Sequence, residues 1–325
     1  MMIQKFLDYI SIERRYSPRT VGEYRDDLYA WCRFLKVAPE NFDPENVSDN
    51  DVREWMIYML DKEGLSPRSV KRRLSAVRSF YKFMLRVGLV QVDITRTIIT
   101  PKTDKPLPIF FRESEMQAFK RNSSLEYDPD EPDPVKRFEA LRNYLIIEML
   151  YQTGMRRAEM IGLTDNDVDT AQAQILVFGK RRKERIVPIG DSLIQLINDY
   201  RQARTLLIGP QDGTNHFLVQ RHHHTESADS DTPDFGAMTA STLYNIVRAR
   251  MGEVSTLKKH SPHVLRHTFA TTMLNNGADI RTIQSLLGHA SLAATQVYTH
   301  TTFEQIQQAY NAAHPRSKKN NKPTD

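Results

Sequence analysis

Apolar residues recur at helical spacing in the N-terminal part of the chain, and the stretch from Ser66 to Val87 shows this pattern most clearly. Its apolar positions are Val70, Leu74, Val77, Tyr81 and Met84. A residue every three or four positions returns to the same side of a helix, so these side chains predict an amphipathic helix packed on a core. Helix starts are predicted at Ser17-Pro18 and Ser66-Pro67, because serine caps a helix and proline is favoured at its first position.

The remaining surface of this predicted helix is basic, and no acidic residue occurs between Ser66 and Val87. Most charged helix faces are solvated surface and mix both signs, whereas an unbroken run of one sign favours contact with a phosphate backbone. We therefore predict that this helix binds nucleic acid. The predicted contacts are Arg68, Lys71, Arg72, Arg78, Lys82 and Arg86.

A proline-rich segment at 97–109, TIITPKTDKPLPI, interrupts the helical periodicity. Three prolines with little periodicity are typical of a linker. A chain of 325 residues is also longer than one core usually organises. We therefore expect two domains, one at 1–96 and the other at 110–325.

The second domain alternates apolar and polar stretches. The run at 138–151 is apolar enough to predict a largely buried helix that ends at Gly154. Two short β-branched runs, 175–179 and 185–189, predict a hairpin with a basic tip. The polar stretches at 121–135 and 220–236 are expected to be loops, with His222–His224 in the second as solvated side chains rather than metal ligands.

The composition changes this picture little. Lys and Arg total 45 against 40 acidic residues, a net charge of +5, which permits a polyanionic partner without requiring one. The one cysteine, Cys32, excludes an intramolecular disulfide and a cysteine-rich zinc site. No signal-peptide pattern and no run long enough to span a bilayer is present in the sequence, so we expect a cytoplasmic protein without membrane insertion.

The stretch SPHVLRHTFATTML contains a histidine and an arginine at a predicted helix start. Ser261-Pro262 predicts that start, which puts His263 and Arg266 in the first turn, three residues apart and on one face. A helix N-terminus favours phosphate, and these side chains add donors for the same anion. Taken alone, the pair would be a capping histidine beside a surface arginine.

A second arginine follows a helix-breaking glycine in the stretch TGMRRAE. Gly154 precedes Arg156 by two residues, and Glu159 lies three residues beyond Arg156. The carboxylate either orients the guanidinium or pairs with it on the surface. The predicted hairpin tip, GKRRKER, adds Lys180, a candidate proton donor in a groove.

The stretch LLGHASLAATQVYTH adds a histidine and a tyrosine. Gly288 predicts a helix end just before His289, and Ser291 predicts the start of the helix that carries Tyr298. A tyrosine in a helix is usually core or surface, and the chain has 13 of them. Only its position relative to the other groups singles out Tyr298.

Taken together, the order and spacing of these residues closely resemble the tyrosine recombinase (phage integrase) family. The matching signatures are TG-x-R-x-x-E, GK-x-x-KER-x-x-P, H-x-LRH-T and LGH followed by a tyrosine nine residues after the histidine. The resemblance extends to the N-terminal SPRTVGEYRDDLYAWCRFL and to the tail AYNAAHPRSKK, which resembles the Xer subgroup. It implies a helical, SAM-like core-binding domain and a mainly helical catalytic domain with a small sheet, forming a C-shaped clamp on DNA.

The resemblance also implies an active site. Its residues would be Arg156, Lys180, His263, Arg266, His289 and the nucleophile Tyr298, with Glu159 in support. In this chemistry the tyrosine forms a 3′-phosphotyrosyl link, His263 acts as base, His289 binds a phosphate oxygen and Lys180 protonates the leaving 5′-oxygen. The order of the two histidines stays open.

One position departs from the family pattern. Arg181 stands where the family commonly has glycine after the hairpin lysine, which leaves Lys183 as a second candidate for the acid. Both Arg181 and Lys183 are also candidate DNA contacts. No metal, ATP or other cofactor is implied.

The implied partner is double-stranded DNA at a specific recombination site. The family works as a tetramer, here of identical chains or with a second Xer-type recombinase, and 302–313 is a plausible helix to donate to a neighbour. Chromosome-dimer resolution at cell division, with a DNA translocase, is the leading role. The alternatives are an integrase or invertase of a mobile element, a type IB topoisomerase and a non-catalytic DNA-binding regulator.

Overall fold

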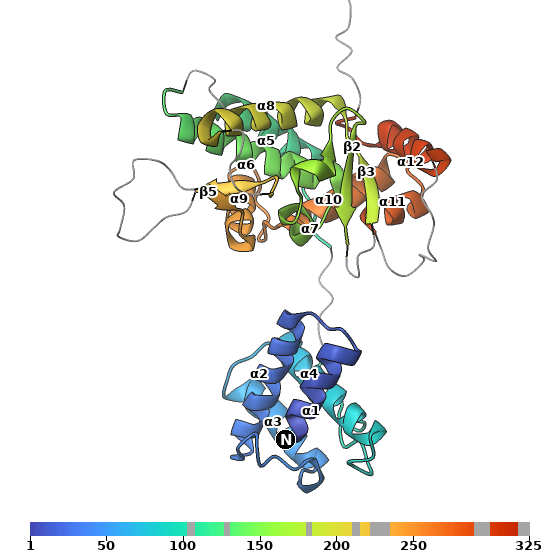
Figure 1. The fold of residues 1–325 in the computed structure, drawn as a ribbon. Helices are drawn as coiled ribbons and strands as arrows, with labels where there is room; N and C mark the ends of the chain where they lie inside the picture. The colour runs from blue at the N-terminus through green and yellow to red at the C-terminus, as the bar shows by residue number, and fades with distance from the viewer. Residues whose placement is uncertain are drawn as a thin grey trace, which may run out of the picture. The chain divides into compact units, whose positions relative to one another are not determined.

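The chain folds into two compact units, Met1–Pro106 and Leu107–Asp325 (Figure 1). The computed structural model describes residues 1–102, 108–126, 131–179, 184–209, 215–221, 235–288 and 300–317. The division falls inside the segment 97–109 that was expected to be the linker. Ile98, however, is 5% exposed and belongs to the core of the first unit, so the start of that segment packs with the N-terminal helices.

Helices make up the first unit. They are α1 (Met2–Asp8), which continues as a π-helical turn η1 (Tyr9–Glu13), α2 (Pro18–Phe34), a 3-10 turn η2 (Pro44–Asn46), α3 (Asp49–Asp61) and α4 (Pro67–Arg86). Both predicted helix starts are confirmed, because the hydroxyl groups of Ser17 and Ser66 each accept a backbone N–H three residues on, at 3.2 Å. The apolar stripe of α4 is buried in the core of this unit.

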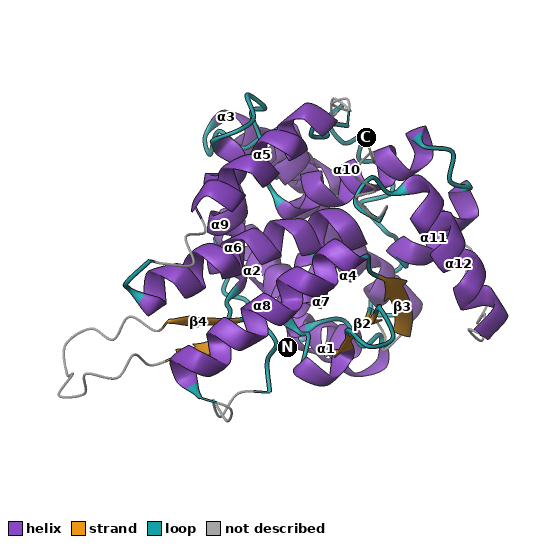
Figure 2. Cartoon of the chain, turned by 90° about the horizontal axis from the view of Figure 1, so that it is seen from above, coloured by secondary structure: helices purple, strands orange, loops and turns teal. Residues whose placement is uncertain are grey.

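The second unit is mostly helical with two small antiparallel sheets (Figure 2). Its helices are α5 (Glu113–Glu126), α6 (Pro134–Thr153), α7 (Arg157–Ile161), η3 (Asp165–Asp167), α8 (Asp191–Ile208), α9 (Ala240–Gly252), α10 (Pro262–Asn275), α11 (Ile280–Leu287) and α12 (His300–Ala313). Its strands are β1 (Val168–Asp169), β2 (Gln174–Phe178), β3 (Glu184–Pro188), β4 (Val219–Arg221) and β5 (Phe235–Ala237). This mainly helical architecture confirms the expected fold class.

The buried helix and the hairpin predicted from the apolar runs are both present. α6 is the central helix, with α5, α8, α9 and α10 packed around it, and it ends at Gly154, whose φ of 60° is left-handed. β2 pairs with β3 from Gln174↔Pro188 to Phe178↔Glu184, and β1 extends this sheet. β3 lies beside α11 and α12 (Figure 1).

The two polar stretches expected to be loops are partly regular structure, so that prediction was wrong at their ends. α5 continues through Glu126, and α6 begins at Pro134 because the Asp133 carboxylate accepts from the backbone N–H of Val135 at 2.9 Å. β4 and β5 pair across the ends of the other stretch, since the apolar side chains of Val219 and Phe235 are buried in the core there. His222–His224 lie outside the described residues.

The C-terminal segment packs on its own unit. Ile306 and Tyr310 of α12 are buried in the core. His314 follows with no exposed surface, its ring stacked on that of Tyr310 at 5.1 Å between centroids, and burial lowers its pKa to about 3. Arg316 and Glu148 then form a buried ion pair at 3.2 Å.

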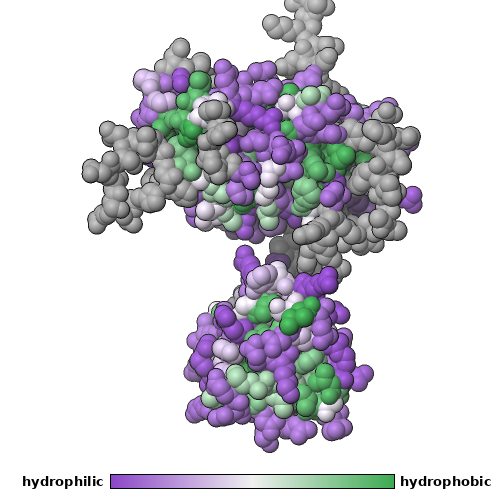
Figure 3. Space-filling view, viewed as in Figure 1, coloured by the Kyte–Doolittle hydropathy of each residue, from purple (hydrophilic) through white to green (hydrophobic). Residues whose placement is uncertain are grey.

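Hydrophilic side chains cover most of the face drawn in Figure 3, with hydrophobic side chains in smaller areas between them. Among the described residues, each helix is too short or too polar to cross a bilayer.

Candidate active site

Gly154 turns the chain at the point where the site begins. Its left-handed φ follows the last turn of α6, and a Cβ atom there would lie 2.4 Å from Cδ1 of Phe269, so only glycine is accommodated. The turn places Arg156 at the N-cap of α7. The helix end predicted at Gly154 is thus confirmed, and Arg156 stands at the start of the next helix.

Arg156 is oriented by Glu159. One terminal nitrogen of the guanidinium donates to Oε1 of Glu159 at 2.6 Å, and the backbone N–H of Arg156 donates to Oε2 at 2.8 Å. The Glu159 side chain is 5% exposed and that of Arg156 is 39% exposed. The sequence left open whether this carboxylate orients the guanidinium or pairs with it on the surface. Because the Glu159 side chain is buried and that of Arg156 is partly exposed, the carboxylate orients the guanidinium.

Arg266 reaches the same turn from α10. Its guanidinium donates to the carbonyl oxygens of Gly154 at 2.6 Å and Leu287 at 2.7 Å, and the residue is 9% exposed. Burial, followed by the charges of Arg156 and Arg185, lowers the pKa of Arg266 to about 10. The group therefore stays charged at neutral pH, and Arg156 and Arg266 are two cations at one turn of the backbone.

His263 lies one turn before Arg266 on α10, as the spacing predicted, and is exposed. Partial burial of the ring and then the charges of Arg157 and Arg266 lower the pKa of His263. Its imidazole is consequently neutral at pH 7 and able to accept a proton. The hydroxyl of Ser261 does not cap α10, although the helix begins at Pro262 as expected.

Arg185 belongs to this cluster, although the sequence analysis did not select it. It donates to both carboxylate oxygens of Glu159, at 3.1 and 2.7 Å, and its Nε donates to the carbonyl of Leu286 at 2.7 Å. A signal was present in the sequence, because Arg185 lies two residues before the apolar Val187, and along a strand such residues point to the same face, here the buried one. The cluster has more cationic than anionic groups, which suits an anionic ligand.

Five of the predicted site residues lie outside the described residues: Lys180, Arg181, Lys183, His289 and Tyr298. The described residues nearest to them in the chain do belong to the cluster. Gly288, which precedes His289, accepts from Arg156 at 3.3 Å. Arg185 lies in β3, the strand that follows the basic tip.

The predicted DNA contacts of α4 divide into two groups. Arg68, Lys71 and Lys82 are exposed. The other three have partners within the first unit, although Arg72 and Arg86 are exposed as well. Arg72 donates to both oxygens of Asp27 at 2.7 and 2.8 Å, Arg78 donates to the carbonyl of Ile98 at 2.6 Å, and Arg86 lies 4.3 Å from the centre of the Tyr9 ring. The geometry thus favours the first three as contacts for a phosphate backbone.

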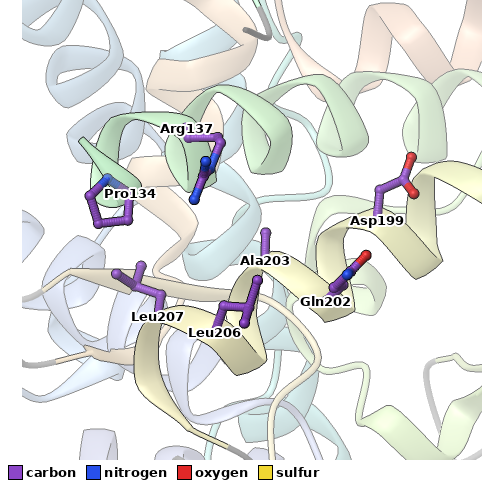
Figure 4. Close-up of a pocket in the computed structure, with 7 residues that line it drawn as sticks. All are labelled: Pro134, Arg137, Asp199, Gln202, Ala203, Leu206 and Leu207. Carbon is purple, nitrogen blue, oxygen red and sulfur yellow. The ribbon is translucent and has the colours of Figure 1, made fainter. Parts of the chain in front are cut away.

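Figure 4 shows a hollow in the second unit whose lining includes none of the arginine cluster's residues. It is lined by Pro134, Arg137, Asp199, Gln202, Ala203, Leu206 and Leu207. It thus lies between α8 and the first turn of α6, whereas Arg156 follows the last turn of α6. At 1.5 Å per residue these two ends are about 30 Å apart.

Comparison with known proteins identifies both units. The pattern of the Phage integrase family matches residues 110–305, and that of the phage integrase N-terminal SAM-like domain matches residues 3–88. Tyrosine recombinase XerC of Chlorobaculum parvum is 36% identical over 330 residues, covering 96% of this chain and 94% of that protein. Tyrosine recombinase XerD of Oceanobacillus iheyensis is 32% identical over 319 residues, covering 97% and 98%.

Solved structures share the fold. The XerH site-specific recombinase bound to its difH substrate has a TM-score of 0.61 at 22% identity, covering 92% of this chain and 80% of that one. The integrase of the Tn1549 transposon with transposon right end DNA has a TM-score of 0.62 at 17% identity, covering 94% and 98%. With a family pattern over more than half of its length and relatives that match it from end to end, the chain belongs to the phage integrase family of tyrosine recombinases, enzymes that transfer DNA strands.

Proposed function

We propose that this recombinase cuts and rejoins DNA at a specific site through a transient covalent bond between Tyr298 and a backbone phosphate. The observation that carries the proposal is the convergence of Arg156 and Arg266 on the turn at Gly154, with the neutral His263 one helical turn away. Guanidinium groups suit a phosphodiester because their paired N–H donors match its non-bridging oxygens.

The chemistry of cleavage follows from these groups. The phenolic oxygen of Tyr298 attacks the phosphorus, the bond from phosphorus to the 5′-oxygen breaks, and a 3′-phosphotyrosine forms. His263 takes the phenolic proton, and Lys180, with Lys183 as the second candidate, gives a proton to the leaving 5′-oxygen. His289 binds a phosphate oxygen.

Rejoining is the reverse of cleavage with a new strand. The 5′-hydroxyl of a partner strand attacks the phosphotyrosine and restores a phosphodiester, so one ester replaces another and ATP is not needed. Arg156 and Arg266 neutralise the non-bridging oxygens in both directions, which is the charge stabilisation that a metal ion would otherwise supply. The proposal is therefore metal-independent.

Arg68, Lys71 and Lys82 of α4 are proposed to bind the DNA backbone away from the reacting phosphate, because they are exposed cations on one helix. Arg181 and Lys183 of the basic tip are proposed to add further contacts. Such phosphate contacts position a protein on DNA without reading its sequence.

We propose resolution of chromosome dimers at cell division as the biological role, in the cytoplasm. The full-length match to XerC and XerD proteins supports this role over a mobile-element integrase or invertase, which stays the second candidate. Four copies, or two copies with two of a second Xer-type recombinase, would assemble on paired DNA sites, with 302–313 passing to a neighbour. A DNA translocase of cell division is a proposed partner.

The test is a trapping experiment on DNA that the host itself supplies. Sequencing the DNA bound by Tyr298→Phe in its host identifies the site, and a duplex of that sequence with a nick beside the scissile phosphate then retains any covalent adduct. Wild-type protein should give an adduct, with or without a chelator, whereas Tyr298→Phe should bind the duplex and give none.

Tyr310→Phe is the matched control, because the hydroxyl of Tyr310 is buried and has no hydrogen-bond partner among the described residues. It should form the adduct normally. An adduct with Tyr298→Phe would show that another residue attacks. Relaxation of supercoiled DNA without recombinant product would favour the topoisomerase reading.

A further inference from the structure

We propose that Arg185 is a positioning residue for strand cleavage: it holds Glu159, and through Glu159 it sets the orientation and charge of Arg156. This inference rests on the proposed function. It concerns a residue that does not touch DNA, since the Arg185 side chain is 4% exposed.

Arg185 and Arg156 share the carboxylate of Glu159. Arg185 binds Glu159 with two parallel hydrogen bonds, at 3.1 and 2.7 Å, in a buried pair. Arg156 binds the same carboxylate from the exposed side. A bidentate contact fixes the plane of a carboxylate, so Arg185 determines where Glu159 presents its oxygens to Arg156.

Arg185 also sets the net charge around Glu159. Burial alone would raise the pKa of Glu159, but the hydrogen bonds and charge of Arg185, followed by the hydrogen bonds of Arg156, hold that pKa below its ordinary value. If Glu159 paired with Arg156 alone, its negative charge would cancel the positive charge of the guanidinium that binds the phosphate. With Arg185 present, the three groups together remain cationic.

The C-terminal end of α11 binds all three arginines. Three consecutive carbonyls there each accept from a different arginine: Leu286 from Arg185 at 2.7 Å, Leu287 from Arg266 at 2.7 Å, and Gly288 from Arg156 at 3.3 Å. The carbonyl end of a helix is its negative end, which stabilises these cations.

Arg185 also defines the space at Gly288. A Cβ atom on Gly288 would lie 3.1 Å from a terminal nitrogen of Arg185, and the left-handed φ of 63° at Gly288 favours glycine as well. Arg185 therefore packs against Gly288 and, through its bond to the carbonyl of Leu286, holds the backbone that accepts from Arg156. Arg185 thus links Arg156 to the backbone that precedes His289.

The experiment compares Arg185→Lys with wild type on the nicked duplex described above, in single-turnover reactions. Lysine keeps the charge but cannot make the parallel bonds to Glu159 while also binding the carbonyl of Leu286. Misplacement of a catalytic group by about 1 Å can cost about 100-fold in rate. We therefore expect cleavage to slow by about 10- to 100-fold while the dissociation constant for the duplex stays within about twofold of wild type, since no DNA contact is lost.

A double-mutant cycle separates positioning from general weakening of the fold. If Arg185 acts through Arg156, the rate loss of Arg185→Lys combined with Arg156→Lys is clearly smaller than the product of the two single losses. The matched control is Arg204→Lys on α8, a buried arginine that binds Asp165 at 2.9 Å and the carbonyl of Phe217 at 3.0 Å. It should cleave at the wild-type rate.

Wild-type cleavage by Arg185→Lys would overturn the inference, as would multiplicative losses in the cycle or a loss explained by weaker DNA binding. If Arg185→Lys does not fold, Arg185→Gln, a neutral donor, takes its place with the same criteria. An absence of adduct with wild-type protein is a different result: it would overturn the proposed function, and this inference with it.

Discussion

Arg156 and Arg266 both donate to carbonyls at the C-terminal end of α11, but Arg266 is held more firmly. Arg266 is buried and holds two carbonyls at 2.6 and 2.7 Å, whereas Arg156 is partly exposed and its carbonyl contact, to Gly288, is 3.3 Å long. Each guanidinium has five N–H groups, so both can donate to a phosphate while keeping some of these bonds. Arg266 thus resembles a fixed part of the site, and Arg156 is the cation with more freedom to turn toward DNA.

The lowered pKa of His263 predicts how cleavage depends on pH. Only the neutral imidazole accepts the proton of Tyr298, and the neutral form persists to a pH below the ordinary value of 6.5. The cleavage rate should therefore be maintained at neutral pH and fall as the pH drops through the lowered pKa. Single-turnover rates between about pH 5 and 8 test this.

His267, also on α10, provides the control for that profile. In His267→Gln the cleavage rate should still fall at acidic pH. His263→Gln should cleave slowly, and its rate should not show that fall. A fall in the cleavage rate that is centred above pH 6.5, or one that persists in His263→Gln, would assign the proton transfer to another group.

At the scale of elements, local signals predicted the starts of α2, α4 and α10, the buried helix α6 and the β2–β3 hairpin, whereas α1, α3, α8, α9 and the β4–β5 pair were not predicted. The serine and proline at the starts of α2 and α4, and the glycine that ends α6, act within one turn, so the sequence alone reveals them. No helix was predicted at α5, and its C-terminal turn was expected to be a loop because of its polar composition, although the helix continues to Glu126.

Contacts between residues far apart in the chain could not be predicted from the sequence. The pairs Arg185–Glu159 and Arg72–Asp27 join residues 26 and 45 positions apart. Sequence spacing could show that Arg185 faces inward, but not which carboxylate it meets. For the same reason all the basic side chains of α4 were expected to be available to DNA, although several of them bind partners within the first unit.

The exposed cations of α4 give a prediction about salt. Affinity for DNA falls with salt concentration on a log–log plot, with a slope of about 0.9 for each phosphate neutralised. Replacing Arg68, Lys71 and Lys82 by Gln one at a time should make that slope shallower by about 0.9 each if each binds one phosphate. Titrations of the site duplex at several salt concentrations measure it.

The control for α4 is Arg19→Gln, an exposed arginine of α2 that is already paired with Glu23 at 2.9 Å. It should leave the slope unchanged. Unaltered slopes in all three α4 variants would mean that this face does not bind DNA phosphates.

At the scale of the whole molecule, two units have their own cores and separate tasks. α4 of the first unit presents cations, and the arginine cluster of the second unit surrounds the turn at Gly154. The C-terminal segment packs on its own unit, where the side chains of Tyr310, His314 and Arg316 are buried. If α12 passes to a neighbour on DNA, as proposed, these buried contacts must open and re-form on the next copy.

The most direct measurement is to locate the bond between protein and DNA. The trapped adduct is digested with trypsin and nuclease, and mass spectrometry then finds the residue that carries the nucleotide. The account predicts a nucleotide joined through its 3′-phosphate to Tyr298, with a free 5′-hydroxyl on the released strand. A nucleotide on any other residue, or a linkage through a 5′-phosphate, would contradict it.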